Sequence, residues 1–257
     1  MTPISLIVMA IWVALSSLIL LFAALDVDAT FRLYYSNIMQ TLSPILSAIL
    51  CYRTMTDFPR GSPMRKVWGF LGSGMLAWGV GAALFSSYPL LNDGAETPYP
   101  YYSDIGYLSL VPLVVTALLV MKNALGISSP LWGKLISILL LAGAMIISVT
   151  ANWQGIFGEG IVLPLVSICY IVFDPILLAI TMQVASALYG GVVGKAWWYV
   201  LAGLVLYFIG NQSYTYLVFT KQYATGSPID AFWVFGFGMI AMAAMMTHAL
   251  FKGVRSS

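Results

Sequence analysis

Long apolar runs, separated by short polar connections, dominate the chain. Eight runs contain about 20 residues or more, which is the length that a helix needs to cross the hydrocarbon core of a membrane. The second run is the most polar, since it contains Ser36, Asn37, Gln40 and Ser43. The runs therefore predict eight membrane-spanning helices. They cover about residues 4–25, 34–53, 66–88, 103–122, 131–150, 161–189, 196–219 and 230–252.

The composition leaves no room for a sizeable soluble domain. Of 257 residues, 61% are hydrophobic and only 8% are charged, whereas soluble proteins contain about 25% charged residues. We therefore predict an all-α integral membrane protein with a single transmembrane domain over residues 1–257, whose main partner is the lipid bilayer. The net charge of +2 is too small to indicate nucleic-acid binding.

Charged residues separate between the two predicted sides of the membrane. Nine of the eleven basic residues fall on one side, and seven acidic residues fall on the other. By the positive-inside rule, the basic side is cytoplasmic. An even number of spans agrees with this, so we expect a multi-pass protein of the cell (inner or cytoplasmic) membrane with both termini in the cytoplasm. The nine basic residues are Arg53, Arg60, Arg65, Lys66, Lys122, Lys134, Lys195, Lys252 and Arg255; the seven acidic residues are Asp26, Asp28, Asp93, Glu96, Asp104, Glu159 and Asp230.

Similar short sequence segments recur in the same order in the two halves of the chain. "LSPILSAI" at 42–49 matches "FDPILLAI" at 173–180, and "WGVG" ending at Gly81 matches "YFIG" ending at Gly210. Asp104 and Asp230 each precede the last span of their half. Recurrence at nearly constant spacing indicates a duplication, with four spans in about 1–125 and four in about 126–257. Two such repeats would have the same orientation and a two-fold axis along the membrane normal. Chance similarity between apolar segments is the alternative.

Asp174 is predicted to lie near the middle of the membrane. It follows Ile161 by thirteen residues, which corresponds to about 20 Å at ~1.5 Å per residue. A charge there costs roughly 2.5 kcal/mol or more, so we expect Asp174 to face the interior of the bundle. Its expected polar neighbours are Tyr170, Gln183, Asn211, Gln212, and Asn37 and Gln40 of the second span. The following proline predicts a broken helix in which Asp174 caps a half-helix, and Ser43–Pro44 predicts the same break in the second span. The alternatives are a purely structural cap, or a role with a ligand, ion or proton.

Asp104 and Asp230 each stand at the predicted start of a span, beside aromatic residues that are typical of membrane interfaces. N-capping explains both positions, because an aspartate at a helix start accepts hydrogen bonds from exposed N–H groups.

The sequence predicts no catalytic residues and no metal site. His248 is the only histidine, and Cys51 and Cys169 lie in apolar runs without a CxxC spacing. The last span has no lysine near its middle for a retinal Schiff base. We therefore expect a protein that is not an enzyme, and the sequence names no cofactor.

Three motifs resemble a prokaryotic polytopic membrane module that precedes diguanylate cyclase (GGDEF), phosphodiesterase (EAL) or histidine kinase domains. The resemblance implies a sensory role, here as a stand-alone protein that signals through a separate partner. Asn211 departs from the pattern, because an acidic residue is expected there. The matching residues are Ser103, Asp104 and Tyr107 in "PYPYYSDIGYLSLVPL", Tyr170, Asp174 and Leu177 in "YIVFDPILL", and Gly226, Ser227, Asp230 and Trp233 in "TGSPIDAFWVFG".

These features lead to one favoured function and two alternatives. The favoured function is a membrane sensor that holds a small apolar or amphipathic molecule (lipid, quinone or pigment) between the repeats, in contact with Asp174, Tyr170 and Asn211. The further candidate ligand-binding residues are Asp104, Tyr107, Asp230 and Trp233. Aromatic and methionine side chains suit such a pocket. The alternatives are a proton-coupled or small-molecule transporter that uses Asp174, and an accessory subunit of a larger membrane complex.

Overall fold

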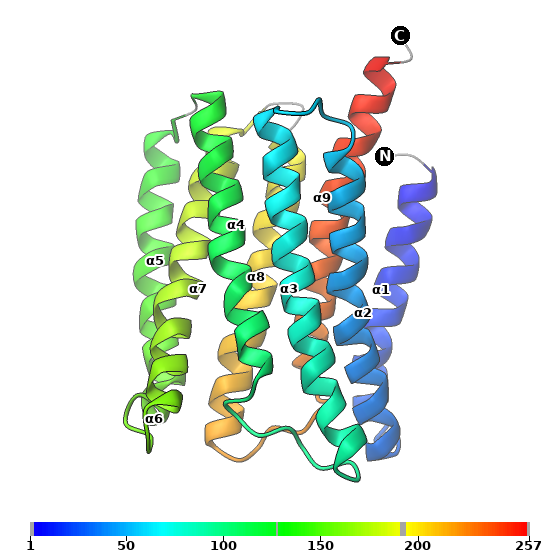
Figure 1. Ribbon diagram of the computed structural model, residues 1–257, viewed down its shortest axis with the longest axis vertical. Coiled ribbons are helices and arrows are strands. Elements are labelled where there is room, and N and C mark those ends of the chain that lie inside the picture. The colour runs from blue at the N-terminus through cyan, green and yellow to red at the C-terminus, as the bar shows by residue number, and fades with distance from the viewer. Residues whose placement is uncertain (1–2, 127, 191–193, 256–257) are drawn as a thin grey trace.

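In the computed structural model, which describes residues 3–126, 128–190 and 194–255, the chain folds into long helices that lie side by side (Figure 1). Each predicted apolar run matches one long helix to within a few residues. The short helix α6 (Trp153–Ile156) has no counterpart among the predictions. The long helices are α1 (Pro3–Ala24), α2 (Ala29–Met55), α3 (Pro63–Leu91), α4 (Ser103–Leu125), α5 (Leu131–Ala151), α7 (Val162–Ala187), α8 (Gly194–Phe219) and α9 (Asp230–Arg255).

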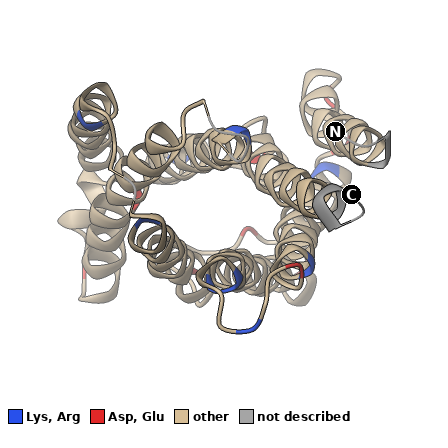
Figure 2. Cartoon of the chain, turned by 90° about the horizontal axis from the view of Figure 1, so that it is seen from above, with Lys and Arg blue, Asp and Glu red and all other residues tan. Residues whose placement is uncertain are grey.

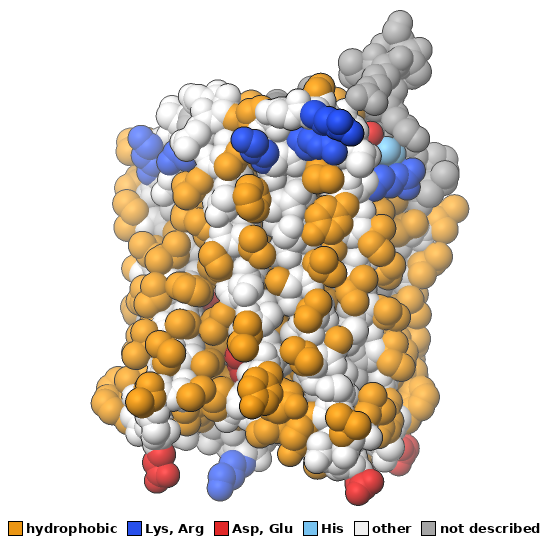
Figure 3. All heavy atoms as spheres, in the orientation of Figure 1, with side chains coloured by type: hydrophobic (Ala, Val, Ile, Leu, Met, Phe, Trp, Pro, Cys, Tyr) orange, Lys and Arg blue, Asp and Glu red, His pale blue; other side chains and the backbone are white. Residues whose placement is uncertain are grey.

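The described helices give the protein a multi-pass membrane character. Six of them, α1, α3, α4, α5, α7 and α9, are long and apolar enough to cross a membrane. On the face drawn in Figure 3, hydrophobic side chains cover the middle, most Lys and Arg side chains gather toward one end, and acidic side chains lie at the other. The first turn of α1 and the last turn of α9 both lie toward the basic end (Figure 1). The side chains of Lys252 and Arg255 lie outside the described residues.

Six helices close into a ring. In the order α2, α3, α4, α7, α8 and α9, each helix contacts the next, and α9 returns to contact α2. Figure 2 shows the ring along the helix axes. Outside it, α1 packs on α9 and α2, while α5 packs on α7 and α8. The outer helices expose large apolar side chains, for example Ile7 of α1 and Leu139 of α5, as expected for surfaces that face lipid.

The interior of the ring is packed with aromatic side chains. Trp68 and Trp197 are almost completely buried, and their ring centroids lie 6.1 Å apart. Glycines bring neighbouring ring helices together. A Cβ atom on Gly106 of α4 would lie 2.5 Å from the carbonyl oxygen of Ala77 in α3, and a Cβ atom on Gly203 of α8 would lie 2.5 Å from that of Gly236 in α9. These helix pairs therefore depend on residues without side chains.

The predicted helix breaks at the two prolines are wrong. Pro175 lies inside α7 and Pro44 lies inside α2, and both helices continue through them. A proline removes one backbone hydrogen bond, whereas a break in the membrane would leave several backbone groups without partners. Asp174 and Ser43 are therefore not N-caps.

The predicted N-capping by Asp104 and Asp230 is also wrong. A cap accepts hydrogen bonds from N–H groups further along its own helix. The Asp104 carboxylate instead accepts from the backbone N–H of Tyr101, and the Asp230 carboxylate from that of Gly226. Both aspartates thus hold the preceding connection against the helix start, and both also accept a hydrogen bond from another helix.

Candidate functional site

The candidate site is a cavity inside the ring. It has a volume of about 30 Å³ and is lined by residues from every ring helix and from the connection between α8 and α9. Tyr107 and Trp233 lie in the first turns of α4 and α9, which places the cavity toward the acidic end of the molecule. The lining residues are Gln40, Trp78, Phe85, Tyr107, Tyr170, Asn211, Tyr214, Thr215, Tyr223 and Trp233.

Behind one wall, Asp174 anchors a chain of amide groups. Its Oδ2 accepts from Asn211 Nδ2 at 3.0 Å and from Gln212 Nε2 at 2.9 Å. Asn211 in turn accepts from Trp233 Nε1 at 2.8 Å, and Gln212 accepts from Asn152 Nδ2 at 3.4 Å. Asp174 is 1% exposed, and its Oδ1 has no hydrogen-bond partner among the described residues. The cluster fixes Asn211 and Trp233 at the cavity wall.

Asp104 supports a second wall. Its Oδ1 accepts from the Tyr170 hydroxyl at 2.8 Å, and its Oδ2 accepts from the backbone N–H of Tyr101 at 2.8 Å. The first bond joins α4 to α7. Tyr170 is therefore held in the lining by a buried carboxylate on the neighbouring helix.

Asp230 supports a third wall. Its Oδ2 accepts from Ser36 Oγ and from the backbone N–H of Gly226, both at 2.7 Å, and its Oδ1 accepts from the Tyr223 hydroxyl at 3.0 Å. Burial raises the pKa of Tyr223 well above its usual range, so this hydroxyl keeps its proton and can donate. The carboxylate joins α2, α9 and the α8–α9 connection, and places Tyr223 in the lining.

The three carboxylates share one arrangement. Each is buried, each lies directly behind a lining side chain, and each accepts a hydrogen bond from it. Among the described residues, no hydrogen bond or ion pair joins any of them to a lysine, arginine or histidine. The ion pairs found there are Arg32–Asp26 and His248–Asp57. The cavity thus has acidic groups on three sides and no basic partner for them.

The structure brings the sequence-predicted residues together. Tyr170, Asn211, Tyr107 and Trp233 line the cavity. The remaining three, Asp104, Asp174 and Asp230, form the layer behind it.

Several lining residues were missed in the sequence. Tyr214 and Thr215 follow Asn211 by three and four residues, which places all three on one helix face. This spacing could have predicted that Tyr214 and Thr215 lie beside Asn211 in the site. Gln40, which the sequence suggested as a neighbour of Asp174, also lines the cavity. Trp78 and Phe85 come from the other half of the chain. Only the closure of the ring places them here, and no local pattern indicates it.

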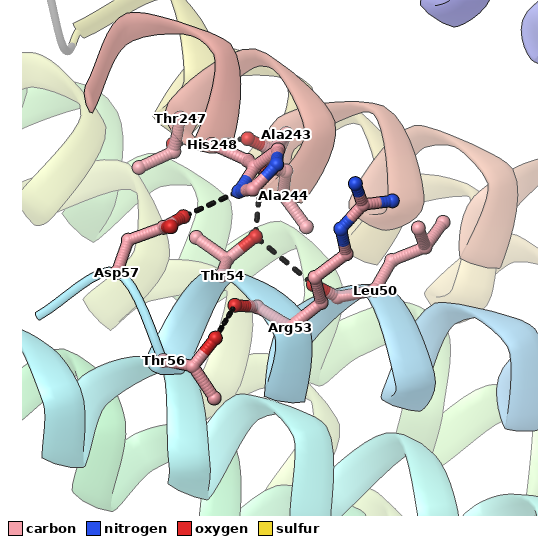
Figure 4. Close-up of polar contacts among 9 residues, drawn as sticks. All are labelled: Leu50, Arg53, Thr54, Thr56, Asp57, Ala243, Ala244, Thr247 and His248. Carbon is pink, nitrogen blue, oxygen red and sulfur yellow. Dashed lines mark hydrogen bonds and ion pairs between the residues drawn. The ribbon is translucent and has the colours of Figure 1, made fainter. Parts of the chain in front are cut away.

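A separate polar contact lies at the basic end of the bundle. Figure 4 shows His248 of α9 beside Asp57, which follows α2, and a hydrogen bond joins His248 Nδ1 to Asp57 Oδ2. Next to it, Thr54 Oγ1 donates to the carbonyl oxygen of Ala244 at 2.9 Å. These bonds fasten α2 to α9 at the end opposite the cavity. Among the described residues, no group of three or more His, Cys, Asp or Glu side chains suits a metal ion.

Comparison with known proteins adds no relative. No family model matches the chain, and neither the curated proteins nor the solved structures contain a match.

Proposed function

We propose that the protein is a non-enzymatic membrane sensor that binds a small ligand in the ring cavity. The observation that carries this proposal is the cavity wall itself, which takes residues from all six ring helices and rests on three buried carboxylates. A buried carboxylate is costly in a membrane. Three of them around one cavity are explained better by a ligand than by packing.

The sensory role follows from how the ligand would touch both halves of the chain. Trp78 and Tyr107 come from one half, and Asn211 and Trp233 from the other. A ligand that binds one arrangement of the halves more tightly than another shifts the balance between them. The resemblance of the three motifs to sensory modules supports the same role, because the aspartate of each motif converges on the cavity. The signal would pass to a separate partner.

The size of the cavity narrows the expected ligand. Binding pockets for drug-sized molecules enclose about 300–1,000 Å³, whereas this cavity has a volume of only about 30 Å³. A compact molecule suits it better than the long-chain lipid, quinone or pigment expected from the sequence.

We further propose that all eight long helices cross the membrane. The two helices less apolar than the others, α2 and α8, contain 27 and 26 residues, which corresponds to about 40 Å at ~1.5 Å per residue. Each lies in the ring between two helices that are apolar enough to span, and their polar residues Asn37, Gln40, Asn211 and Gln212 are buried. The positive-inside rule then places the basic end and both termini in the cytoplasm.

The proposed duplication has support from pairs of matching residues. Trp68 and Trp197 are separated by the same 129 residues as the "WGVG" and "YFIG" phrases, and they contact each other, as matching residues do beside a two-fold axis. A Cβ atom on Gly81 would meet the Tyr107 ring, and one on the matching Gly210 would meet the Trp233 ring.

The two interfaces between the halves also correspond to each other. Asp230 of α9 bonds Ser36 of α2, and Asp104 of α4 bonds Tyr170 of α7. In both interfaces the aspartate lies at the start of the last helix of its own half. It accepts a hydrogen bond from the second long helix of the other half.

One observation favours transport as a second candidate function. The free Oδ1 of buried Asp174 is a site for a proton or a coupled ion, although the broken helices that first suggested a transporter are absent. Asp174→Asn would then abolish uptake in proteoliposomes without affecting folding. Undiminished uptake by this variant would remove the candidate.

The main proposal is tested by identifying small molecules that stay with the purified protein. The full chain is purified in mild detergent, extracted with solvent, and the extract is analysed by mass spectrometry. We expect one compact molecule in the wild type and in the control Ile138→Ala, whose side chain is exposed on α5, and a loss of at least about ten-fold in Trp233→Ala. Equal amounts in all three proteins, or bulk lipid alone, would overturn the proposal.

A further inference from the structure

We propose that the ligand of the ring cavity is a small organic cation, a protonated or methylated amine. This inference rests on the proposed ligand-binding function and names the chemical class of its ligand. Three properties of the cavity wall support it.

The first property is a continuous aromatic wall. The ring of Trp78 lies 4.7 Å from that of Tyr107 and 6.1 Å from that of Trp233, and the ring of Tyr214 lies 5.8 Å from that of Trp233. Phe85 extends the wall at 6.4 Å from Tyr214. The face of an aromatic ring is electron-rich and attracts a cation within about 6 Å of its centre. Several such rings around one small space are typical of sites for substituted ammonium groups.

The second property is that several polar lining side chains donate hydrogens to protein partners. Tyr170 and Tyr223 each donate their hydroxyl hydrogen to an aspartate behind the wall. Thr215 donates its hydroxyl hydrogen to the carbonyl oxygen of Asn211 at 3.0 Å.

The two lining amides follow the same pattern. Asn211 donates to Asp174, and Gln40 donates from Nε2 to Ser36 Oγ at 2.9 Å. A hydroxyl that has given away its hydrogen offers a ligand only lone pairs, and Gln40 Oε1 is also an acceptor. The three hydroxyls and Gln40 Oε1 therefore offer acceptors to a ligand. They suit a molecule that brings its own N–H donors or a positive charge.

The third property is the set of three buried carboxyl groups behind the wall. Asp104, Asp174 and Asp230 surround the cavity without a basic partner among the described residues. Buried carboxylates without a counter-charge are costly, and a cation between them relieves that cost. The aromatic wall alone would accept a neutral apolar molecule. The acceptors and carboxylates together select a cation.

The test compares two probes of almost the same shape. Choline carries a trimethylammonium group, and 3,3-dimethylbutan-1-ol replaces its charged nitrogen by carbon. Both are titrated into the purified full chain in detergent at matched ionic strength, and binding is followed by calorimetry and by tryptophan fluorescence, because Trp78 and Trp233 line the cavity. We expect choline to bind at least about ten-fold more tightly than the alcohol.

Two variants connect the preference to the cavity. Tyr170→Phe keeps the aromatic ring and removes one acceptor oxygen, and we expect it to weaken choline binding several-fold while leaving binding of the alcohol unchanged. The control Ile138→Ala binds both probes as the wild type does. Thermal unfolding of each variant confirms that it is folded. If Tyr170→Phe does not fold, Thr215→Val replaces it, with the same expectation.

The outcomes separate this inference from the proposed function. If the alcohol binds as tightly as choline, or if the molecule that copurifies is neutral or anionic, the cation inference is overturned and the ligand-binding function stands. If neither probe binds and no small molecule copurifies, both the cation inference and the ligand-binding function are overturned.

Discussion

Two matching positions in the two halves of the chain share a backbone and differ in chemistry. Ser43–Pro44 lies inside α2 and Asp174–Pro175 lies inside α7, and both helices continue through the proline. Asp174 accepts two hydrogen bonds from α8. Ser43 is 2% exposed, and its hydroxyl has no partner among the described residues.

The helices opposite these positions differ in the same way. The residues of α3 that match Asn211 and Gln212 at the 129-residue spacing are Ala82 and Ala83. One half thus holds an aspartate with two amides, and the other holds a serine with two alanines. Helices α2 and α3 pack against each other without such a cluster, and more closely than α7 and α8 do. Because the cluster lies behind the wall of the proposed binding cavity, we attribute it to ligand binding.

The largest effect is expected when the polar cluster loses one member. Asn211→Ala removes a donor from buried Asp174 and the acceptor of Trp233, and breaking a buried charged group's contacts costs about 3 kcal/mol. Unfolding in detergent, followed by tryptophan fluorescence, measures the change. A loss below about 1 kcal/mol would show that Asp174 does not depend on this contact.

Close helix packing should behave alike in both halves. Gly106→Ala and Gly203→Ala each place a Cβ atom 2.5 Å from a backbone oxygen of the next helix, and such overpacking costs about 1–3 kcal/mol. The same unfolding measurement applies to both variants. If only one of the two variants lost stability, the packing of the two halves would not be equal.

Asp174→Asn should separate binding from stability. The variant keeps the shape of the side chain and removes its charge, so we expect about ten-fold weaker choline binding with a stability change below about 1 kcal/mol, because neutral hydrogen bonds contribute only about that much. Calorimetry and unfolding give the two values. Unchanged choline affinity would exclude a role for the charge.

The smallest effect is expected at the matching serine. Ser43→Ala removes a buried hydroxyl that has no partner, so stability should stay the same or rise slightly, and choline affinity should not change. Calorimetry and unfolding are again the measurements. A clear loss of affinity would mean that the first half also contributes polar chemistry at this position.

The parts of the molecule that local rules determine were predictable from the sequence. The long helices follow from the length of the apolar runs, and the inward position of Asp174 follows from the cost of a charge in lipid. Asn211 and Gln212 were recognisable as its neighbours because amides are rare in an apolar helix. The matching short sequences predict two halves, and this duplication stays a prediction.

The rest depends on contacts between distant residues. A rule for isolated helices predicted breaks at Pro44 and Pro175, whereas the packed helices continue through them. Asp104 and Asp230 look like caps in sequence, but their partners Tyr170 and Ser36 come from other helices. Gln40 and Trp78 reach the cavity only because the ring closes. No pattern along the chain carries that information.

The central claim is that the ring cavity holds a ligand through its polar half. Native mass spectrometry of the intact protein, released gently from detergent, measures this most directly by the mass that remains bound. We predict one compact molecule per chain in the wild type and in Ser43→Ala, and its loss in Asp174→Asn. A bound mass that is the same in all three proteins, or absent from all of them, would contradict the account.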